Sequence, residues 1–208
     1  MSARDDVLAA VRDALGPGRH DPAAPDGATS AGQPVPEHAA ELADRSAMLD
    51  LFADRVADYR ATVTRCSPTD LAVTVTWALE GASSVVVPPG LELDLPEAVV
   101  DDGLTHAELD AVDAVVTSAA VGIAETGTVV LDHGAGQGRR AVTLLPDLHV
   151  CIVRESQVVA DVPDALPHLD PQRPQTWISG PSATSDIELS RVEGVHGPRR
   201  LHVVLVAQ

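Results

Sequence analysis

The sequence predicts an α/β domain in which helices flank a mostly parallel sheet. At 208 residues with 45% hydrophobic content, the chain is long enough to bury one sizeable core. Short Val-rich runs alternate with segments of helical periodicity, which is the rhythm of β-α-β units. These runs are apolar throughout rather than alternating with polar residues. Such continuous runs are typical of parallel strands that are covered on both faces.

The first 36 residues are expected to stand apart from this domain. Residues 2–15 have the periodicity of a short amphipathic helix, with Ser2 as its N-cap. From there to about Pro36 the chain is rich in Pro, Gly, Ala and Asp, which favours a flexible linker. We therefore divide the chain into residues 1–36, a helix with a linker, and residues 37–208, the α/β domain. The first helix docks either on a partner or on its own domain, and the sequence leaves both open.

Helices and strands are expected to alternate within the domain. Apolar residues at near-helical spacing predict a long helix from about Glu37 to Ala61. A second helix begins after Ser67, an N-cap residue that is followed by Pro68 at the first helical position. Strands are expected over residues 62–65, 84–87, 110–118, 129–131, 149–153, 176–179 and 201–206.

Composition excludes several classes of function. The formal charge of −17 and the 2% aromatic content argue against a nucleic-acid binder, which holds phosphates with basic residues and stacks bases on aromatic rings. An anionic membrane surface is disfavoured for the same electrostatic reason. All fourteen basic residues are Arg. Without Lys there is no Schiff-base pyridoxal enzyme, no P-loop lysine and no Ser-Lys dyad.

The two cysteines, Cys66 and Cys151, are far apart, and the chain has no CxxC and no Cys/His cluster of zinc-ligand spacing. The sequence therefore predicts neither a metal site nor an iron–sulfur cluster in this chain. No secretory signal pattern is present, and no apolar run approaches the roughly 18 to 20 residues that span a bilayer. We expect a soluble cytoplasmic protein without membrane insertion.

The first candidate site segment is Glu125-Thr126-Gly127-Thr128, which follows an apolar strand expected over residues 115–123. Ligands of open α/β sheets bind outside the carboxyl ends of the strands. Glu125 is therefore a candidate catalytic carboxylate, and the three residues after it are candidate substrate-binding residues. In the alternative interpretation, the segment is a tight hairpin in which Gly127 only turns the chain.

The second candidate segment runs from Gly180 to His202. His196 stands on a short loop between glycines and before a proline, which suits a general acid or base. Residues 180–186 are dense in small hydroxyl side chains, as anion-binding loops are, although a solvated loop that caps its own backbone has the same composition. The substrate-binding candidates of this segment are Ser182, Asp186, Glu188, Gly197 and His202.

Three further side chains complete the candidates. Arg139 and Arg140 are candidates for binding an anionic substrate group, with a solvated basic turn as the alternative. His149 is either a satisfied core histidine or part of the same cleft. The carboxylates and histidines of the two segments contain no HxH or i,i+4 pair, so we predict no metal there.

Several motifs in one order resemble the lactate-utilization (LUD) domain family. They are Ile123-Ala-Glu-Thr-Gly-Thr-Val-Val-Leu, the Arg-Ala-Val-Thr-Leu-Leu-Pro segment ending at Pro146 with His149 close behind, Ile178-Ser-Gly-Pro-Ser, Ser185-Asp-Ile-Glu, and Gly194-Val-His-Gly-Pro-Arg. The resemblance covers roughly residues 110–206. It implies a fold like that of ribose-5-phosphate isomerase, CoA transferases and formyltetrahydrofolate cyclo-ligase, an α/β sheet flanked by helices.

The resemblance also implies a function. It points to a non-redox component of a system that oxidises L-lactate to pyruvate and includes iron–sulfur partner proteins. In that system this chain binds a small anionic ligand and carries no cofactor. His196 would serve as the base and Arg139 or Arg140 would bind the carboxylate. The segment at Glu125 is also similar to the Glu-x-Gly at which CoA transferases form a glutamyl thioester. A stand-alone enzyme of the CoA-transferase or isomerase type, and a ligand-binding scaffold protein, are therefore the alternatives.

Overall fold

The computed structural model describes residues 45–184, 192–193 and 197–207, and the account that follows concerns these residues. The predicted N-terminal helix and linker lie outside this part of the chain, so the division after residue 36 stays a prediction. The described residues contain no helix that is both long and apolar enough to cross a membrane.

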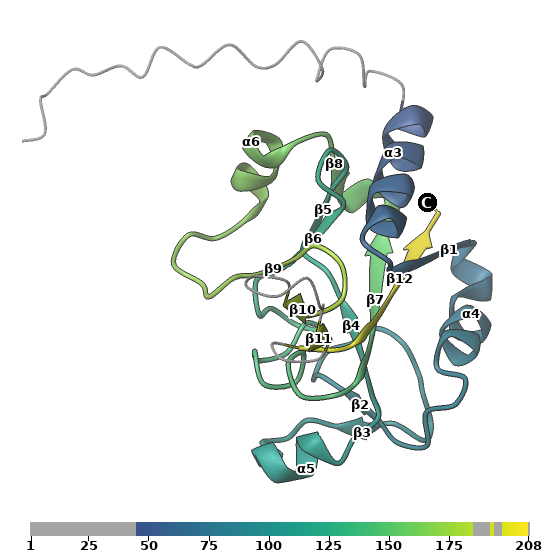
Figure 1. The fold of residues 1–208 in the computed structure, drawn as a ribbon, viewed down its shortest axis with the longest axis vertical. Helices are drawn as coiled ribbons and strands as arrows, with labels where there is room; N and C mark the ends of the chain where they lie inside the picture. The colour runs from purple at the N-terminus through teal and green to yellow at the C-terminus, as the bar shows by residue number, and fades with distance from the viewer. Residues whose placement is uncertain (1–44, 185–191, 194–196, 208) are drawn as a thin grey trace, which may run out of the picture. The chain divides into compact units, whose positions relative to one another are not determined.

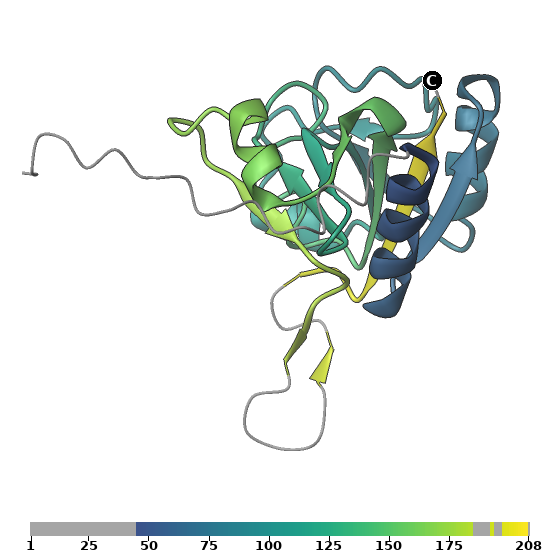
Figure 2. The ribbon, with the colours of Figure 1, turned by 90° about the horizontal axis from the view of Figure 1, so that it is seen from above.

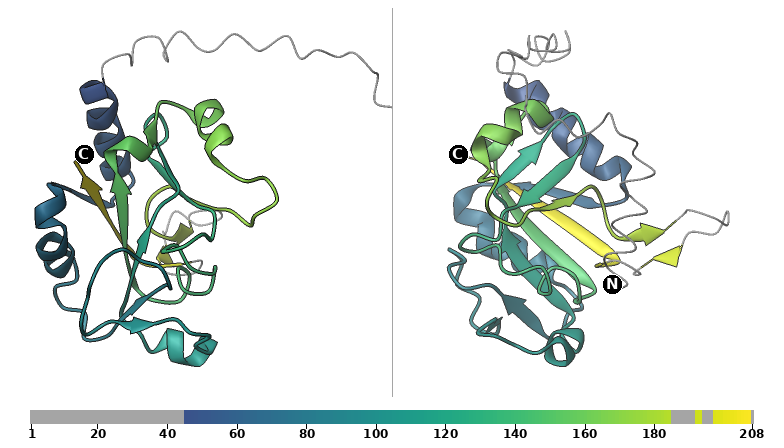
Figure 3. Two further views of the ribbon diagram at one scale, coloured as in Figure 1. Left: turned by 180° about the vertical axis from the view of Figure 1, so that it is seen from behind. Right: turned by 90° about the vertical axis from the view of Figure 1, so that its left-hand side faces the viewer.

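Six parallel strands form the central sheet (Figure 1). In spatial order they are β1 (Thr62–Cys66), β12 (Arg200–Val206), β7 (Leu148–Arg154), β4 (Ala114–Ser118), β2 (Val85–Val87) and β3 (Val99–Val100). β7 and β12 are seven residues long, pair along their whole length and are buried except at one end residue each. Figure 3 shows these two strands running side by side. The predicted mostly parallel α/β fold is confirmed.

Helices cover both faces of this sheet because each presents an apolar stripe to it. α3 (Arg45–Asp58) buries Met48, Leu49, Phe52 and Val56 in one core, and α4 (Leu71–Ala78) contributes Val75 to the core of the opposite face. Figure 2 shows the two helices on either side of β1 and β12. The shorter helical elements are α5 (His106–Asp110), α6 (Val162–Ala165), η1 (Pro68–Asp70), η2 (Glu155–Gln157) and η3 (Leu166–His168).

The helix ends follow local capping rules. The predicted long helix ends at Asp58 rather than Ala61, and Arg60 follows it with a φ of 66°; residues 37–44 lie outside the described part. The Ser67 side chain accepts a hydrogen bond from Asp70 N–H, as its N-cap role predicts, and the helix opens with the η1 turn before α4. α5, which the periodicity did not predict, begins with a capping box between Thr105 and Glu108.

A second sheet packs beside the first and holds the segment around Glu125. Its strands, in order, are β8 (Val158–Val159), β5 (Val121–Ile123), β6 (Thr128–Leu131) and β9 (Thr176–Ile178), and β5 and β6 form an antiparallel hairpin. The strand predicted over residues 115–123 is thus two strands in two sheets. The chain changes sheets at Ala119, whose N–H donates to Ile152, and Ala120, whose N–H donates to Val130. β10 (Ala183–Thr184) and β11 (Val192–Glu193) form a separate antiparallel pair.

Candidate functional site

A cleft of about 260 Å³ opens where the amino ends of β7 and β12 meet the second sheet. We call it the amino-end cleft. Ligands of open α/β sheets usually bind outside the carboxyl ends of the strands, so this cleft lies at the opposite end of the sheet. Its lining consists of Arg140, Thr143, His149, residues 176–182, Gly197, Pro198 and Leu201.

His149 is the most deeply buried polar residue of this cleft among the described residues. The residue is 1% exposed, and its Nε2 lies 2.8 Å from the hydroxyl oxygen of Thr117 on the neighbouring strand β4. Burial, helped by the positive charge of Arg140, lowers the pKa of His149 to about 4. The imidazole is therefore uncharged at neutral pH, and it can either accept or donate a hydrogen bond.

Cys151 lies on the other side of Thr117, with its sulfur 3.8 Å from the same hydroxyl. Burial raises the pKa of the Cys151 thiol to about 12, so it stays protonated at neutral pH. A thiol in this state is a poor nucleophile. The neighbourhood of His149 is thus arranged for hydrogen bonding and not for thiol chemistry.

The two adjacent arginines, Arg139 and Arg140, have different surroundings. Arg139 donates from Nε and Nη2 to the two carboxylate oxygens of Asp101, at 2.8 and 2.9 Å, and it also bonds the carbonyl of Leu104. The carboxylate of Asp101 is 5% exposed, and the hydrogen bond from Arg139 holds its pKa below the usual range. Arg140 lines the cleft and forms no ion pair with a carboxylate among the described residues. Arg140 is therefore the cation that the described residues bring to this cleft.

Residues 180–182, 197, 198 and 201 of the second candidate segment line the cleft. The N–H of Ser182 donates to the carbonyl of Pro198 at 2.8 Å, which joins the two parts of the segment that line the cleft. Gly180 has a φ of +78°, and a Cβ there would lie 2.5 Å from Cβ of Tyr59, so only glycine lets the loop lie this close to the end of α3.

A row of hydroxyls links the first segment to this wall. The hydroxyls of Thr126 and Thr128 are 2.7 Å apart, and that of Thr128 is also 2.7 Å from the hydroxyl of Ser179. Of these, Ser179 lines the cleft. Thr128 therefore reaches the cleft only through Ser179.

Glu125 lies apart from the cleft lining, exposed in the turn of the β5–β6 hairpin. Its N–H donates to the carbonyl of Ala160 at 3.0 Å. Gly127, with a φ of +58°, packs onto α3, where a Cβ would lie 2.6 Å from the carbonyl carbon of Arg55. The segment is a tight hairpin, as the alternative interpretation proposed, and the catalytic role of Glu125 stays a prediction.

His202 lies on the opposite face of the sheet from His149. Its Nε2 is 2.8 Å from the hydroxyl of Thr64, and its ring packs edge-on against Trp77 of α4 with centroids 5.6 Å apart. Burial lowers its pKa as well. The register pairs His149 with Leu201, so the next residue, His202, points the other way. His196, Asp186 and Glu188 lie outside the described residues.

The structure thus gathers Arg140, His149, Ser182 and Gly197 from the predicted residues, and it adds Thr143 and Ser179. Both hydroxyls lie in motifs of the family resemblance, although neither was among the predicted binding residues. Thr143 is 3% exposed and its hydroxyl donates to the carbonyl of Arg140, which fixes the turn that carries the cation. In the described ranges, no three side chains of His, Cys, Asp or Glu come together as a metal site.

This parallel sheet, with a glycine-bordered cleft that holds the Arg140 cation, defines an α/β protein able to hold a small anion. Residues 49–206 match the family model of the LUD domain. Because this match covers most of the chain, the protein belongs to the LUD domain family.

Individual relatives agree with that membership. The chain is 50% identical over 171 residues to lactate utilization protein C of Deinococcus radiodurans, covering 78% of this chain and 81% of that protein. It is 38% identical over 101 residues to lactate utilization protein C of Shouchella clausii, covering 45% of this chain and 44% of that protein. A crystal structure of a DUF162 family protein from Deinococcus radiodurans superposes with a TM-score of 0.69 at 43% identity, over 78% of this chain and 98% of that one.

Proposed function

We propose that this protein is a non-redox component of L-lactate oxidation to pyruvate, and that its amino-end cleft binds the small carboxylate. Relatives that bear the name lactate utilization protein C support the substrate class. The observation that carries the proposal is the placement of Arg140, without a carboxylate partner among the described residues, beside the uncharged His149.

The chemistry of these groups suits a 2-hydroxy or 2-oxo acid. The guanidinium of Arg140 pairs with the carboxylate, since it offers two parallel N–H donors. The neutral imidazole of His149 accepts a hydrogen bond from the hydroxyl of lactate or donates one to the ketone of pyruvate. The hydroxyls of Ser179 and Ser182 border the same cleft. The cleft can therefore hold both substrate and product.

Oxidation of lactate to pyruvate releases two electrons and two protons. We propose that the electrons pass to iron–sulfur clusters on partner proteins, because this chain has only two cysteines, far apart in sequence. The chain then acts in the cytoplasm as one subunit of a complex. His196 remains the proposed base for the hydroxyl proton, since its neighbour Gly197 lines the cleft.

Arg140→Gln tests the binding step. We expect L-lactate and pyruvate to bind the parent chain in calorimetric titration, and the variant to lose roughly tenfold or more in affinity because a charge-assisted pair is lost. Arg55→Gln is the matched control, because Arg55 is an exposed arginine on α3 that lies outside the cleft. Equal affinity in Arg140→Gln and the parent would overturn the assignment.

A reconstitution assay tests the subunit role. We expect cluster-bearing partner proteins to oxidise L-lactate faster when this chain is added, and the chain alone to show no turnover. Partners that oxidise lactate equally well without the chain would contradict the proposal. The alternative enzyme of the CoA-transferase type requires a thioester on Glu125, and labelled CoA trapped on that residue would favour it instead.

A further inference from the structure

A second cavity, of about 280 Å³, lies at the carboxyl ends of the central strands. We call it the carboxyl-end cavity. Ser118 ends β4 and Arg154 ends β7, so this cavity and the amino-end cleft lie at opposite ends of β7. Its lining consists of Leu71, residues 90–92, residues 118–120, Ala135, Gln137, Ile152, Arg154 and Gln157. This is where ligands of open α/β sheets commonly bind.

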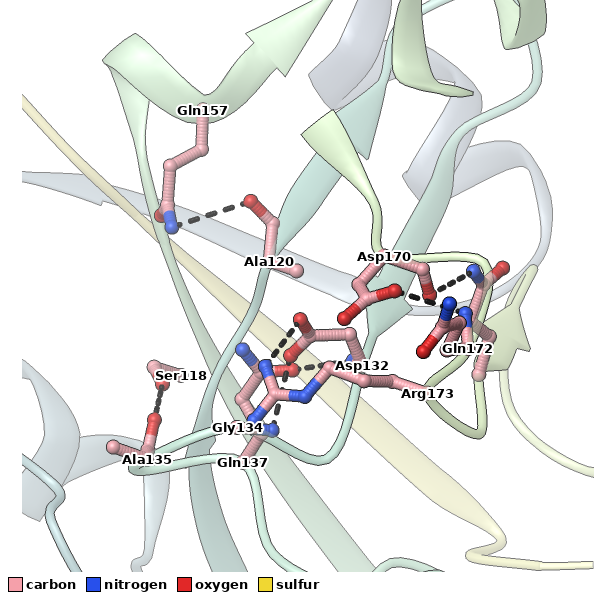
Figure 4. Close-up of polar contacts among 11 residues, drawn as sticks. Ser118, Ala120, Asp132, Gly134, Ala135, Gln137, Gln157, Asp170, Gln172 and Arg173 are labelled. Atoms are coloured by element: carbon pink, nitrogen blue, oxygen red, sulfur yellow. Dashed lines mark hydrogen bonds and ion pairs between the residues drawn. The ribbon is translucent and has the colours of Figure 1, made fainter. Parts of the chain in front are cut away.

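Gln137 brings an unsatisfied donor to this cavity. The residue is 7% exposed, and its Oε1 accepts the N–H of Asp132 at 2.6 Å (Figure 4). Because that bond requires the amide oxygen, the NH₂ group is fixed on the other side of the amide. No acceptor among the described residues bonds this NH₂ group. Buried donors are nearly always hydrogen-bonded to protein, water or a ligand, so this amide has an open position for such a partner.

Among the other polar groups of the cavity, the Ser118 hydroxyl can also donate, and the Glu92 carboxylate is paired with Arg154. The hydroxyl of Ser118 has only a long contact, 3.5 Å, to the carbonyl of Ala135. The carbonyls of Ala119 and Ala120, which would be acceptors, already accept from Nε2 of Gln157 at 2.7 and 3.4 Å, and Figure 4 draws the contact with Ala120. The cavity therefore offers hydrogen-bond donors to its ligand and has few acceptors left.

The positive charge of the cavity comes from Arg154. Its Nη2 lies 3.0 Å from a carboxylate oxygen of Glu92, and both side chains are largely exposed. Exposed pairs of this kind contribute little to stability, so a bound anion can take the place of Glu92 at small cost. One such cation matches a singly charged anion better than a phosphate dianion, which Glu92 would repel.

The loop that carries Gln137 is fixed before any ligand binds. Gly136 N–H donates to the carbonyl of Pro89 at 2.9 Å, and its carbonyl accepts from Ser118 N–H at 2.8 Å. Gly136 has a φ of +73°, and a Cβ there would lie 2.8 Å from the Ser118 hydroxyl, so glycine is required at this position. Arg173 holds Asp132, the bonding partner of Gln137, at 2.9 Å. A preordered donor favours binding.

We propose that the carboxyl-end cavity binds a small aliphatic monocarboxylate, separately from the amino-end cleft. The Gln137 amide and the Ser118 hydroxyl donate to the carboxylate, and Arg154 neutralises its charge. The aliphatic part contacts Leu71, Leu91 and Ile152, which line the same cavity. This site goes beyond the proposed function, because it shares no lining residue with the cleft that holds Arg140.

Side-chain amide NMR on the full chain tests the proposal directly. The chain has no Asn and its glutamines are Gln33, Gln137, Gln157, Gln172, Gln175 and Gln208, so the signal lost in Gln137→Glu identifies the Gln137 amide. We expect butyrate to shift this signal, in the parent and in Arg140→Gln alike, and inorganic phosphate to shift it much less. An unmoved Gln137 signal, an equal response to phosphate, or a shift that depends on Arg140 would each overturn the proposal.

Three substitutions complete the test. Gln137→Glu keeps the acceptor for Asp132 N–H but replaces the donor with a charged oxygen, so butyrate affinity should fall roughly tenfold or more. Gln172→Glu adds the same charge at an exposed position and should leave the affinity unchanged. Glu92→Gln removes the carboxylate that competes for Arg154, so butyrate affinity should rise several-fold. This variant still tests the proposal if Gln137→Glu does not fold. Unchanged or weaker binding in Glu92→Gln would contradict the assignment of Arg154.

Discussion

His149 and His202 lie near the amino ends of adjacent strands, yet they occupy opposite faces of the sheet. Both are buried and both hydrogen-bond a threonine hydroxyl, and burial lowers the pKa of each. Only His149 borders a cleft that also holds a cation. Because successive side chains of a strand point to opposite faces, a shift of one residue determines which histidine is available to a ligand.

The buried neutral state of His149 makes stability depend on pH. Its pKa is about 4 in the folded chain, against an ordinary value of 6.5 for a solvated histidine. Between these values the unfolded imidazole binds a proton that the folded one does not, so stability falls as the pH is lowered from 6.5 towards 4. The full effect is roughly 3 kcal/mol. Urea unfolding of the parent and of His149→Gln at about pH 7.5 and about pH 5 should show a smaller acid loss in the variant.

His106→Gln is the control, because it removes a histidine from an exposed position on α5. We expect it to lose as much stability on acidification as the parent. His202 contributes in the same direction as His149, since burial lowers its pKa too, so the double variant at positions 149 and 202 should have the flattest profile. An acid loss in His149→Gln equal to that of the parent would show that the imidazole is protonated in the folded chain.

At the scale of elements, the contact between the β5–β6 hairpin and α3 depends on Gly127. Its φ is +58°, and a Cβ added there would come within 2.6 Å of the Arg55 backbone, which leaves no room for a side chain. Gly103 offers a matched comparison, since it also has a positive φ, +82°, but nothing lies within 4 Å of its Cβ position. The two glycines separate backbone strain from packing.

We expect Gly103→Ala to cost about 1 kcal/mol of unfolding free energy, the strain of a left-handed backbone alone. Gly127→Ala should cost roughly 2 kcal/mol more, because α3 and the hairpin must also move apart. Urea unfolding of the two variants at neutral pH measures the difference. Similar losses in both would mean that the hairpin adapts to the added methyl group without disturbing α3.

The local sequence pattern predicted where strands form better than it predicted which sheet each strand joins. The Val-rich runs became β2, β4, β7 and β12, because burial on both faces demands apolar residues throughout. β6 and β9 have equally apolar or β-branched sequences but belong to the second sheet, and nothing between residues 115 and 123 announces the change of sheet. The Thr105-x-x-Glu108 capping box is a local signal from which α5 could have been predicted.

The candidate site shows the same limit. The sequence identified Arg139 and Arg140 as equivalent anion binders, because neighbours in a turn have identical local patterns. Their roles differ because Arg139 binds the carboxylate of Asp101. Asp101 lies 38 residues from Arg139 in sequence, at the end of β3. The free amide of Gln137 likewise depends on which of its atoms meets Asp132. Such assignments follow from tertiary contacts that no local pattern contains.

At the scale of the whole molecule, the central strand β7 joins two cavities of similar size. The amino-end cleft lies at His149 and the carboxyl-end cavity at Arg154, and each region has an arginine on its lining. An anion that approaches either region meets a chain whose formal charge is −17. Local cations must therefore overcome a repulsive field, which favours small, singly charged ligands at both sites.

The same net charge should make the folded chain more stable in salt. With 31 acidic residues against 14 arginines, repulsion among carboxylates opposes compaction, and added ions screen it. Raising NaCl from about 0.05 M to about 0.5 M at about pH 7.5 should raise Tm by a few degrees, at roughly 2–4 °C per kcal/mol for a chain of this size. KCl should raise Tm by the same amount as NaCl, because screening depends on ionic strength. Chloride salts are used because sulfate stabilises folded proteins in general. A Tm that falls with salt would mean that attractive pairs such as Arg139–Asp101 and Arg173–Asp132 outweigh the repulsion.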